Sequence, residues 1–580
     1  MIRALLAAFL LLSAQAHAAS APPAEGAHAM VVTVNRLATE AGDEVLRQGG
    51  NAVDAAVAVA YALAAVDPCC GNIGGGGFML IHLANGQDHF INFREMAPAA
   101  ASANMYLDAG GKPIPRASLD GIRAVGIPGT VAGLEMALTR YGTMPRAKLM
   151  QAAIHLAQDG FVLSRANTDI LDTRTTAFRR NPELARIFLR PDGSALQPGD
   201  RLTQSNLGRT LSEIAAGGPD AFYKGRIPQA IAALSQRDGG VITEADFAAY
   251  HAQEIAPLRC EFHGATVISS PPPSSGGVTL CETLNILSGD DLHALGWHSA
   301  AEVHLLVEAM RRAYFDRNAN LGDPDFVKMP LERLLSKEYA ASLRAQFTDK
   351  ATPSASLGSV TSNSEKPQTT HFSIIDQAGN AVSMTFTING SFGAMAMAEG
   401  TGFLLNNEMD DFTTVLGGAN LYGLVQGAAN TIAPGKRPLS SMTPTIVLRD
   451  GRVAMVTGSP GGSRIITITL QSMLNALDFG MNPQEAVDAP RIHHQFQPDV
   501  IFAEPYALSA DTKAALLAMG YKITEQVPWG AAEMIAVGPA TAAPGLAMPA
   551  NDAALSGKMR PGLFYGASDN RRPAGSAAGF

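Results

Sequence analysis

The stretch KPQTTHFSIID, residues 366–376, lies where the character of the sequence changes most sharply. The preceding segment, 359–368, is mostly polar, whereas 372–375 is apolar and typical of a strand. Thr369 and Thr370 stand at the junction. One interpretation is structural, because threonine favours strands and their edges. The other is that the peptide bond before Thr369 is cut, which makes this residue a new N-terminus.

An N-terminal threonine brings a nucleophile and a base together on one residue. Its hydroxyl is a weak nucleophile that needs a base, and an α-amino group with a pKa of about 8 is partly unprotonated at neutral pH. The precursor can release this amine if the Thr369 hydroxyl attacks the Gln368 carbonyl and the resulting ester is hydrolysed. Thr370 is the rival nucleophile, because a cut one residue later would give it the amine.

The segments on both sides of this junction have clear strand and helix patterns. The predicted strands, several of them paired by turns at 85–86, 377–380 and 450–451, are 30–34, 78–83, 89–93, 372–376, 381–387, 444–450 and 452–458. The predicted helices are 35–51, which ends at Gly49-Gly50, the alanine-rich 52–67, and 461–479. Residues 147–335 are predicted to be mostly helical, with a loop at 269–277. The sequence therefore predicts a mixed α/β enzyme-sized fold.

A glycine run, GNIGGGGF at residues 71–78, precedes one of these strands. It is not a phosphate-binding loop, because it lacks Gly-Lys-Ser/Thr and does not open a helix with the spacing G-x-G-x-x-G. Glycines that run into a strand are better explained by close backbone packing, which we expect beneath an active site.

Composition excludes several classes of function. The chain has 580 residues, of which 47% are hydrophobic and 16% charged, so it is an ordered globular protein. The length allows roughly two to four domain-sized units, or one large intertwined body. The net charge is -9 and the sequence has no long basic run. Nucleic acid is therefore not an expected partner.

The N-terminus predicts export. Arg3 is followed by a short apolar run, 4–12, and by the small-x-small pattern at 16–18. These features are typical of a signal peptide removed after Ala18, and the apolar run is too short for a stable membrane anchor. No later stretch has the ~20 apolar residues of a membrane helix. We therefore expect a periplasmic or secreted protein.

Export permits disulfides among the four cysteines. Cys260 and Cys281 are 21 residues apart and are able to pair, although the sequence alone does not settle this. Cys69 and Cys70 are adjacent, and adjacent cysteines rarely pair because the geometry is strained. We therefore expect Cys69 and Cys70 to be free and buried. Their spacing does not predict zinc.

Motifs throughout the chain resemble those of the γ-glutamyltransferases, also called glutathione hydrolases. They are, in order, GNAVDAAVA, GNIGGGGFML, FREMAP, PPPSSGG, QTTHFSIIDQAGNAVSMTFTING, LLNNEMDDF, KRPLSSMTPTIV, TGSPGGSRI and LFYGASDNRR. The resemblance covers nearly the whole chain after the signal peptide. It implies an N-terminal-nucleophile hydrolase with a four-layer αββα sandwich. It also implies self-cleavage into a large subunit, 19–368, and a small subunit, 369–580, with both contributing strands.

The resemblance also assigns roles to individual residues. The implied nucleophile is Thr369, supported by Thr387, and the implied oxyanion hole is formed by the backbone N–H groups of Gly461 and Gly462. The residues implied to bind the substrate are Arg94, Ser440 and Ser441 for its α-carboxylate, Asn389, Glu408 and Asp411 for its α-amino group, and Tyr422 as a lid. These residue types suit a γ-glutamyl group, because an arginine fork binds a carboxylate and acidic groups bind an ammonium.

Several structural interpretations compete with these roles. Arg94 could form a surface ion pair with Glu95, and the Asp410–Asp411 pair could be a solvated turn. His493 and His494 have no metal-ligand spacing, so a structural role is expected. The motif LSSMTP, 439–444, lacks the G-x-S-x-G elbow of a serine hydrolase.

The implied activity is hydrolysis or transfer of the γ-glutamyl group of glutathione and related compounds. An ester on Thr369 forms first, and water, an amino acid or a dipeptide then takes the group. No metal or organic cofactor is implied. Two alternatives stay open: an amidase of the same fold acting on another acyl amide, such as a cephalosporin precursor, and an uncleaved exported binding protein. Asp411 favours a γ-glutamyl substrate, since relatives acting on cephalosporin side chains tend to lose this aspartate.

Overall fold

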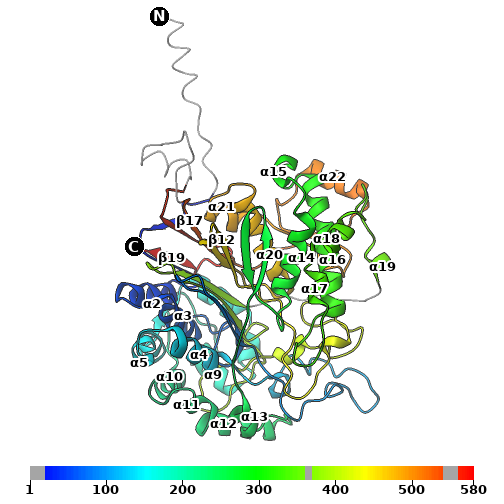
Figure 1. The fold of residues 1–580 in the computed structure, drawn as a ribbon. Helices are drawn as coiled ribbons and strands as arrows, with labels where there is room; N and C mark the ends of the chain where they lie inside the picture. The colour runs from blue at the N-terminus through cyan, green and yellow to red at the C-terminus, as the bar shows by residue number, and fades with distance from the viewer. Residues whose placement is uncertain (1–19, 359–368, 540–558) are drawn as a thin grey trace, which may run out of the picture.

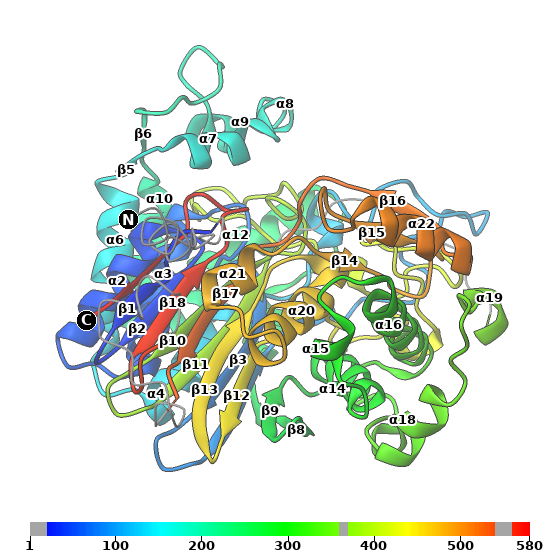
Figure 2. The same cartoon turned by 90° about the horizontal axis from the view of Figure 1, so that it is seen from above.

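The computed structural model describes residues 20–358, 369–539 and 559–580. The predicted signal peptide, 1–18, and the polar segment 359–368 lie outside these residues. Two seven-stranded sheets pack against each other, and helices cover the outer face of each (Figures 1 and 2). The predicted four-layer sandwich is therefore confirmed. Within the described ranges, no helix has both the length and the apolar character needed to cross a bilayer.

The first sheet is built around the strand that follows Thr369. That strand pairs antiparallel with the next one through the predicted turn. In this turn the Asp376 N–H donates to the Asn380 carbonyl oxygen at 3.0 Å. In spatial order the strands are β19 (Ser576–Gly579), β2 (Met30–Thr33), β10 (Thr370–Ile375), β11 (Ala381–Thr387), β3 (Gly76–His82), β4 (Asp88–Phe93) and β7 (Gln253–Ile255). All neighbouring strands in this sheet are antiparallel.

The second sheet is also antiparallel throughout. Its strands, in spatial order, are β1 (Ala24–Gly26), β18 (Phe564–Ser568), β17 (Glu533–Val537), β13 (Arg452–Gly458), β12 (Thr445–Arg449), β9 (Ala265–Ser269) and β8 (Leu258–Phe262). Two small sheets consist of β14 (Ile492–His493), β15 (Ile501–Ala503) and β16 (Ile523–Glu525), and of β5 (Phe161–Val162) and β6 (Arg201–Leu202).

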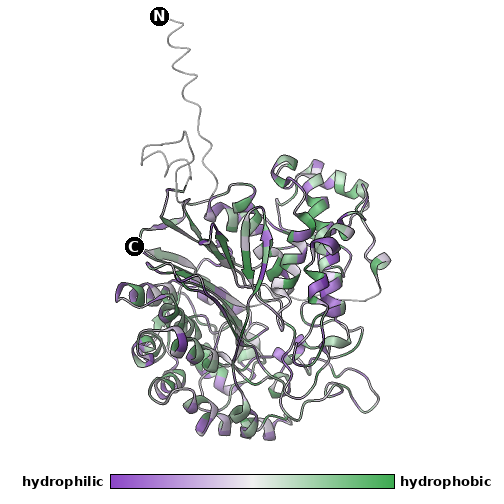
Figure 3. Ribbon diagram, viewed as in Figure 1, coloured by the Kyte–Doolittle hydropathy of each residue, from purple (hydrophilic) through white to green (hydrophobic). Residues whose placement is uncertain are grey.

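The central strands are buried on both faces because each sheet lies between another sheet and a helical layer. In β3, Phe78 and Leu80 point into the core between the sheets, whereas Met79 and Ile81 pack against helices. Successive side chains of a strand point to opposite faces, so a continuous apolar run is required here. Figure 3 shows the strands largely in the hydrophobic colour, while the outer helices carry hydrophilic residues as well.

Helices before residue 250 cover the first sheet. The alanine-rich helix α3 (Ala52–Val66) lies directly on β10 and β11 and is buried along its whole length. Its start is fixed by a capping box: the Asn51 side chain accepts from the N–H groups of Val53 and Asp54, and the Asp54 carboxylate accepts from the Asn51 N–H, all at 2.9 Å. The helices of this part are α2 (Arg36–Arg47), α3, α4 (Thr130–Tyr141), α5 (Arg146–Leu149), α6 (Gln151–Gln158), α7 (Arg165–Asp172), α8 (Thr175–Phe178), α9 (Pro182–Phe188), α10 (Ser205–Gly217), α11 (Asp220–Tyr223), α12 (Arg226–Arg237) and α13 (Glu244–Ala249).

A second group of helices lies on the other sheet. α14 and α20 pack directly on its strands, and α16 packs against α14. The group comprises α14 (Gly276–Leu287), α15 (Leu292–Leu295), α16 (Ala300–Asn320), α17 (Leu331–Leu334), α18 (Lys337–Arg344), α19 (Ser354–Leu357), α20 (Ile465–Leu477), α21 (Pro483–Asp488) and α22 (Ala510–Met519). The predicted helix at 461–479 is thus α20, preceded by a short 3₁₀ turn, Gly462–Arg464.

Both sheets mix strands from before and after Thr369. The first sheet takes β10, β11 and β19 from the later part of the chain and its other four strands from the earlier part. The change in sequence character at this residue is therefore no domain boundary. A cut here would leave the two pieces interlocked by the hydrogen bonds of both sheets.

The cysteine prediction was partly wrong. Cys69 and Cys70 are buried as expected, but they form a disulfide with each other. They lie in a tight turn after α3, in which the Cys70 N–H donates to the Asp67 carbonyl at 3.2 Å. The strain argument assumed that adjacent cysteines lie in ordinary backbone, and this turn is an exception. A second disulfide, Cys260–Cys281, joins β8 to α14.

Candidate active site

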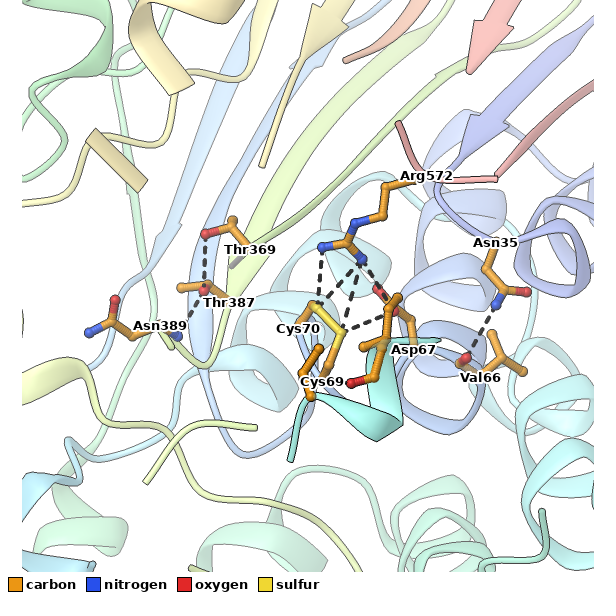
Figure 4. The surroundings of a disulfide bond; sticks show 11 residues. Asn35, Val66, Asp67, Cys69, Cys70, Thr369, Thr387, Asn389 and Arg572 are labelled. Carbon is orange, nitrogen blue, oxygen red and sulfur yellow. Dashed lines mark hydrogen bonds and ion pairs between the residues drawn. A yellow bond between two sulfur atoms is a disulfide. The ribbon is translucent and has the colours of Figure 1, made fainter. Parts of the chain in front are cut away.

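The two predicted catalytic threonines meet at the ends of neighbouring strands. Thr369 immediately precedes β10 and Thr387 ends β11, and the hairpin register brings their hydroxyl oxygens to 3.3 Å (Figure 4). Both side chains are buried. The Thr387 hydroxyl also accepts from the Asn389 N–H at 2.8 Å. The hydroxyl of Thr369 is thus already next to a second hydroxyl in the folded chain.

The glycine run packs under these threonines, as predicted. A Cβ at Gly75 would lie 1.8 Å from the Thr387 carbonyl oxygen, and one at Gly77 would lie 2.4 Å from the Thr385 carbonyl oxygen. No side chain fits at such distances. These glycines therefore let β3 approach β11 directly beneath the site.

The disulfide turn holds the loop that follows Thr387. The Cys70 carbonyl accepts from the Ile388 N–H at 3.0 Å, and the Cys69 carbonyl accepts from the Phe392 N–H at 2.8 Å. Figure 4 shows this turn next to Thr387, with the Arg572 guanidinium beside the sulfur atoms. The loop carries Asn389, which has a φ of +70°. Two fixed anchors stabilise this otherwise uncommon backbone conformation.

Arg94 lies in a buried ion cluster, not on the surface. Its Nη1 donates to Glu408 and, at 3.4 Å, to Glu95, and its Nη2 donates to Asp411. Its Nε donates to the Pro438 carbonyl at 3.1 Å. All four charged side chains are buried, so the alternatives of a surface ion pair and a solvated turn are wrong.

The carboxyl groups of this cluster outnumber its arginine. Burial raises the pKa of Glu408 well above its ordinary value and raises that of Asp411, while Arg94 opposes both shifts. Burial likewise raises the pKa of Glu95 to about 7. One oxygen of Glu95 and one of Glu408 have no hydrogen-bond partner in the described part of the chain. The cluster therefore favours a further cation.

Ser440 and Ser441 line the same pocket as Glu408 and Asp411, and the oxygen of each serine already accepts a hydrogen bond. The Met442 N–H donates to Ser440 Oγ at 3.0 Å, and Arg317 Nη2 donates to Ser441 Oγ at 3.1 Å. Neither hydroxyl donates to an acceptor among the residues that the structure describes. Both hydroxyl protons are therefore available to an acceptor that enters the pocket.

Gly461 and Gly462 form a bend before α20. Their φ angles are +146° and +56°, which a residue with a side chain rarely adopts. Neither backbone N–H has an acceptor within the described ranges. Gly462 lines the same pocket as Thr369, and adjacent backbone N–H groups without partners are the donors that an oxyanion hole requires.

Tyr422 covers the site from the loop after the acids. Its hydroxyl donates to Asn389 Oδ1, and the Asn389 amide donates to the Asn407 carbonyl at 2.9 Å. Tyr422 is 8% exposed. Tyr422 thus lines the pocket and contacts Asn389, a predicted substrate-binding residue.

One pocket brings the predictions together. It is lined by ten of the eleven predicted site residues, and the eleventh, Gly461, directly precedes the lining residue Gly462 in the sequence. The predicted lining residues are Arg94, Thr369, Thr387, Asn389, Glu408, Asp411, Tyr422, Ser440, Ser441 and Gly462. Sequence reasoning missed Glu95 as a cluster member and Arg317 as a lining residue. Glu95 had a signal, since it follows Arg94 in FREMAP, whereas nothing local marks Arg317.

The paired histidines are structural, as expected. His493 Nδ1 lies 2.8 Å from the Thr467 hydroxyl, and His494 Nε2 lies 3.4 Å from an Asp499 oxygen. Burial lowers the pKa of His494 to about 4. Neither histidine lines the pocket, so they do not act there as bases.

Comparison with known proteins adds to this geometry. The family model for gamma-glutamyltranspeptidase matches residues 38–579. A glutathione hydrolase proenzyme of Pseudomonas sp. (strain A14) is 51% identical over 97% of this chain and 96% of its own length. The glutathione hydrolase proenzyme of Escherichia coli (strain K12) is 46% identical over 96% of this chain and 93% of its own length. A solved cephalosporin acylase from Bacillus halodurans has a TM-score of 0.82 at 24% identity over 98% of both chains, which supports the fold alone.

Proposed function

This chain belongs to the gamma-glutamyltranspeptidase family, and we propose that it is a self-processing enzyme that cleaves γ-glutamyl amides such as glutathione. The observation that carries the proposal is the contact between the Thr369 and Thr387 hydroxyls, 3.3 Å apart, in a pocket with one buried arginine facing three acids. That pocket suits a donor with an ammonium and a carboxylate on one carbon.

Maturation is the first step. The Thr369 oxygen attacks the Gln368 carbonyl carbon, the peptide C–N bond breaks, and the amine becomes the α-amino group of Thr369. Water then hydrolyses the ester. The products are a large subunit, 19–368, and a small subunit, 369–580, which the mixed sheets hold together as a heterodimer.

Turnover repeats this chemistry on the donor. The free α-amino group takes the hydroxyl proton of Thr369, and the oxygen attacks the γ-carbonyl. The N–H groups of Gly461 and Gly462 stabilise the oxyanion. The amine leaves with a proton, and water or the amine of an acceptor amino acid or dipeptide attacks the γ-glutamyl ester. Thr387 supports the nucleophile throughout.

Donor recognition uses the two sides of the pocket. Arg94, Ser440 and Ser441 bind the α-carboxylate. The α-amino group is held by Asn389, Glu408 and Asp411, and it satisfies the Glu408 oxygen that has no partner. Tyr422 closes over the bound donor. The signal-like N-terminus supports a periplasmic or secreted location.

Intact mass and N-terminal sequencing after incubation at neutral pH test maturation. We expect two chains, the smaller beginning with Thr369, Thr370 and His371. A cut one residue later would transfer the nucleophile to Thr370. A single intact chain with ligand binding and no turnover would instead support the binding-protein alternative.

Thr369→Ala should remove both maturation and turnover, because alanine lacks the hydroxyl that is the proposed nucleophile in both steps. The matched control is Thr370→Ala. The hydroxyl of Thr370 is buried and has no partner among the described residues, so the variant that lacks it should mature and react. Mass and initial rates on a γ-glutamyl anilide report both results. A Thr369→Ala protein that still yields two chains and turns over would contradict the mechanism.

The same assay with a glutaryl anilide tests the substrate class. A glutaryl group is a γ-glutamyl group without the α-amino group, so it cannot use the acids. We expect the γ-glutamyl compound to react at least about ten-fold faster in kcat/KM, the size of one charge-assisted hydrogen bond. Equal or inverted rates would favour the alternative of an amidase for other acyl amides.

A further inference from the structure

Arg317 brings a second positive charge to the donor pocket. It lies near the end of α16, is 1% exposed, and lines the same pocket as Thr369 and Arg94. It comes from the helical layer on the second sheet, whereas Arg94 follows β4 in the first. The pocket is therefore bordered by one buried guanidinium from each half of the sandwich.

The contacts of Arg317 are all with neutral groups. Its Nε donates to Ser275 Oγ at 3.0 Å, its Nη1 to the Asn318 and Gln426 side chains at 2.9 and 3.0 Å, and its Nη2 to Ser441 Oγ at 3.1 Å. No carboxylate among the described residues lies within 4.0 Å of it. The second hydrogen of its Nη2 likewise has no acceptor among them.

Two other arginines on the same helix show how unusual it is for a buried arginine to have no ion-pair partner. Arg311 is ion-paired with Asp499 and Glu308, and Arg312 is ion-paired with Glu308 at 2.7 Å. All three arginines are almost fully buried. A buried charge is normally paired, because leaving water is costly without an opposite charge. Burial lowers the pKa of Arg317 to about 10, so it remains a cation at neutral pH.

Arg94 has little capacity left for a carboxylate. Four of its five N–H groups already donate, to Pro438, Glu95, Glu408 and Asp411. An α-carboxylate that relied on Arg94 alone would have to compete with three acids. Arg317 has no carboxylate within 4.0 Å among the described residues, so only the longer-range attraction of Asp411 competes for it. Its hydrogen bond to Ser441 leaves the serine proton available to a new acceptor.

We propose that Arg317 is a specificity-determining residue that adds a second positive charge for the donor's α-carboxylate, next to the hydrogen-bond donor Ser441. The proposal rests on the proposed γ-glutamyl activity and deepens it. The pocket then has an excess of acid around Arg94, and a second guanidinium, Arg317, with no carboxylate within 4.0 Å among the described residues. An α-amino-acid zwitterion satisfies both at once, and an uncharged or singly charged acyl group does not.

Three anilides that differ only in their charged groups test the proposal: γ-glutamyl, glutaryl without the α-amino group, and 4-aminobutyryl without the α-carboxylate. With Arg317→Met, kcat/KM should fall about 10- to 100-fold for the two carboxylate donors, the range of a hydrogen bond to a charged group. It should change less than about three-fold for 4-aminobutyryl. Arg317→Lys should recover part of the loss, mainly through KM, because it keeps the charge without the fork.

The matched control is Arg312→Met, which removes a buried arginine of the same helix whose charge is already paired. It should lower the melting temperature without changing the ratio of rates among the three donors. Equal losses on all three donors for Arg317→Met, or no loss, would overturn the proposal. If Arg317→Met does not mature, the test uses Arg317→Lys instead. The proposal then requires that kcat/KM of this variant falls only for the two carboxylate donors. Wild-type enzyme that prefers glutaryl would instead refute the proposed function.

Discussion

Two buried ion clusters in this protein contain the same types of residue but differ in the balance of positive and negative charge. The donor cluster contains Arg94 with Glu95, Glu408 and Asp411. The second, here called the C-terminal cluster, contains Arg491 and Arg571 with Glu504 and Asp569. In the C-terminal cluster two cations face two anions, whereas in the donor cluster one cation faces three acids.

Hydrogen bonding separates the clusters further. Both oxygens of Asp569 are satisfied: one by Arg491 and the Ala532 N–H at 3.0 Å, the other by the Arg571 N–H and Nη1 at 2.9 and 3.0 Å. Arg491 and Arg571 accordingly hold the pKa of Asp569 below its ordinary value, although burial opposes them. In the donor cluster burial prevails and the carboxyl pKa values rise.

The difference identifies what a buried ion cluster is for. A complete cluster binds elements of the fold together, and removing one member leaves a charge without a partner. An incomplete cluster is maintained by the surrounding structure and becomes complete only when a ligand arrives. The same substitution, aspartate to asparagine, should therefore have opposite consequences in the two places.

Asp569→Asn should have the largest effect on stability. It leaves Arg491 buried beside a neutral amide, and breaking a buried pair costs about 3–5 kcal/mol. The melting temperature of the mature enzyme, followed by circular dichroism, should fall by a few degrees. Asp200→Asn is the control, since Asp200 pairs with the solvent-exposed Arg190 and its loss should lower the melting temperature far less. Equal stability of the Asp569 and Asp200 variants would remove the distinction between the clusters.

Asp411→Asn should affect selectivity, with little effect on stability. Arg94 keeps Glu408 and Glu95 as partners, so no buried charge is left alone. We expect kcat/KM for a γ-glutamyl anilide to fall about 10- to 100-fold, and that for a glutaryl anilide to stay within a few-fold, because only the first carries an ammonium. A melting temperature that drops as far as that of Asp569→Asn would show that the donor cluster is also structural.

Most residues that line the pocket could be identified from the sequence because they lie in short motifs. FREMAP, NNEMDDF, LSSM and SPGGSR each contain one or more residues that line the pocket. The strands and the hairpin at 377–380 followed from local patterns for the same reason. Ser441, by contrast, is 124 residues from Arg317 in the sequence, and the packing of α16 on α14 brings them together in the fold. The Cys69–Cys70 bond likewise depends on a turn that composition does not reveal.

The smallest expected effect is a pH dependence of stability. Burial raises the pKa of Glu95 from 4.5 to about 7 in the folded protein. The folded state therefore holds this proton more tightly than the unfolded state. The resulting stabilisation is complete below the unfolded pKa and is lost as the pH rises through about 7.

Glu95→Gln tests this contribution because glutamine keeps the shape and has no proton to lose. Melting temperatures of the ligand-free mature enzyme between pH 5 and 8 should fall less with pH in the variant, by roughly one or two degrees over the range. Glu261→Gln, on the exposed face of β8, should leave the slope unchanged.

A donor ammonium should reduce the wild-type slope as well, because it gives the acids the cation that the empty cluster lacks. Parallel slopes for Glu95→Gln and wild type would mean that the pKa of Glu95 does not change on folding, and the contrast with the C-terminal cluster would then rest on hydrogen bonding alone.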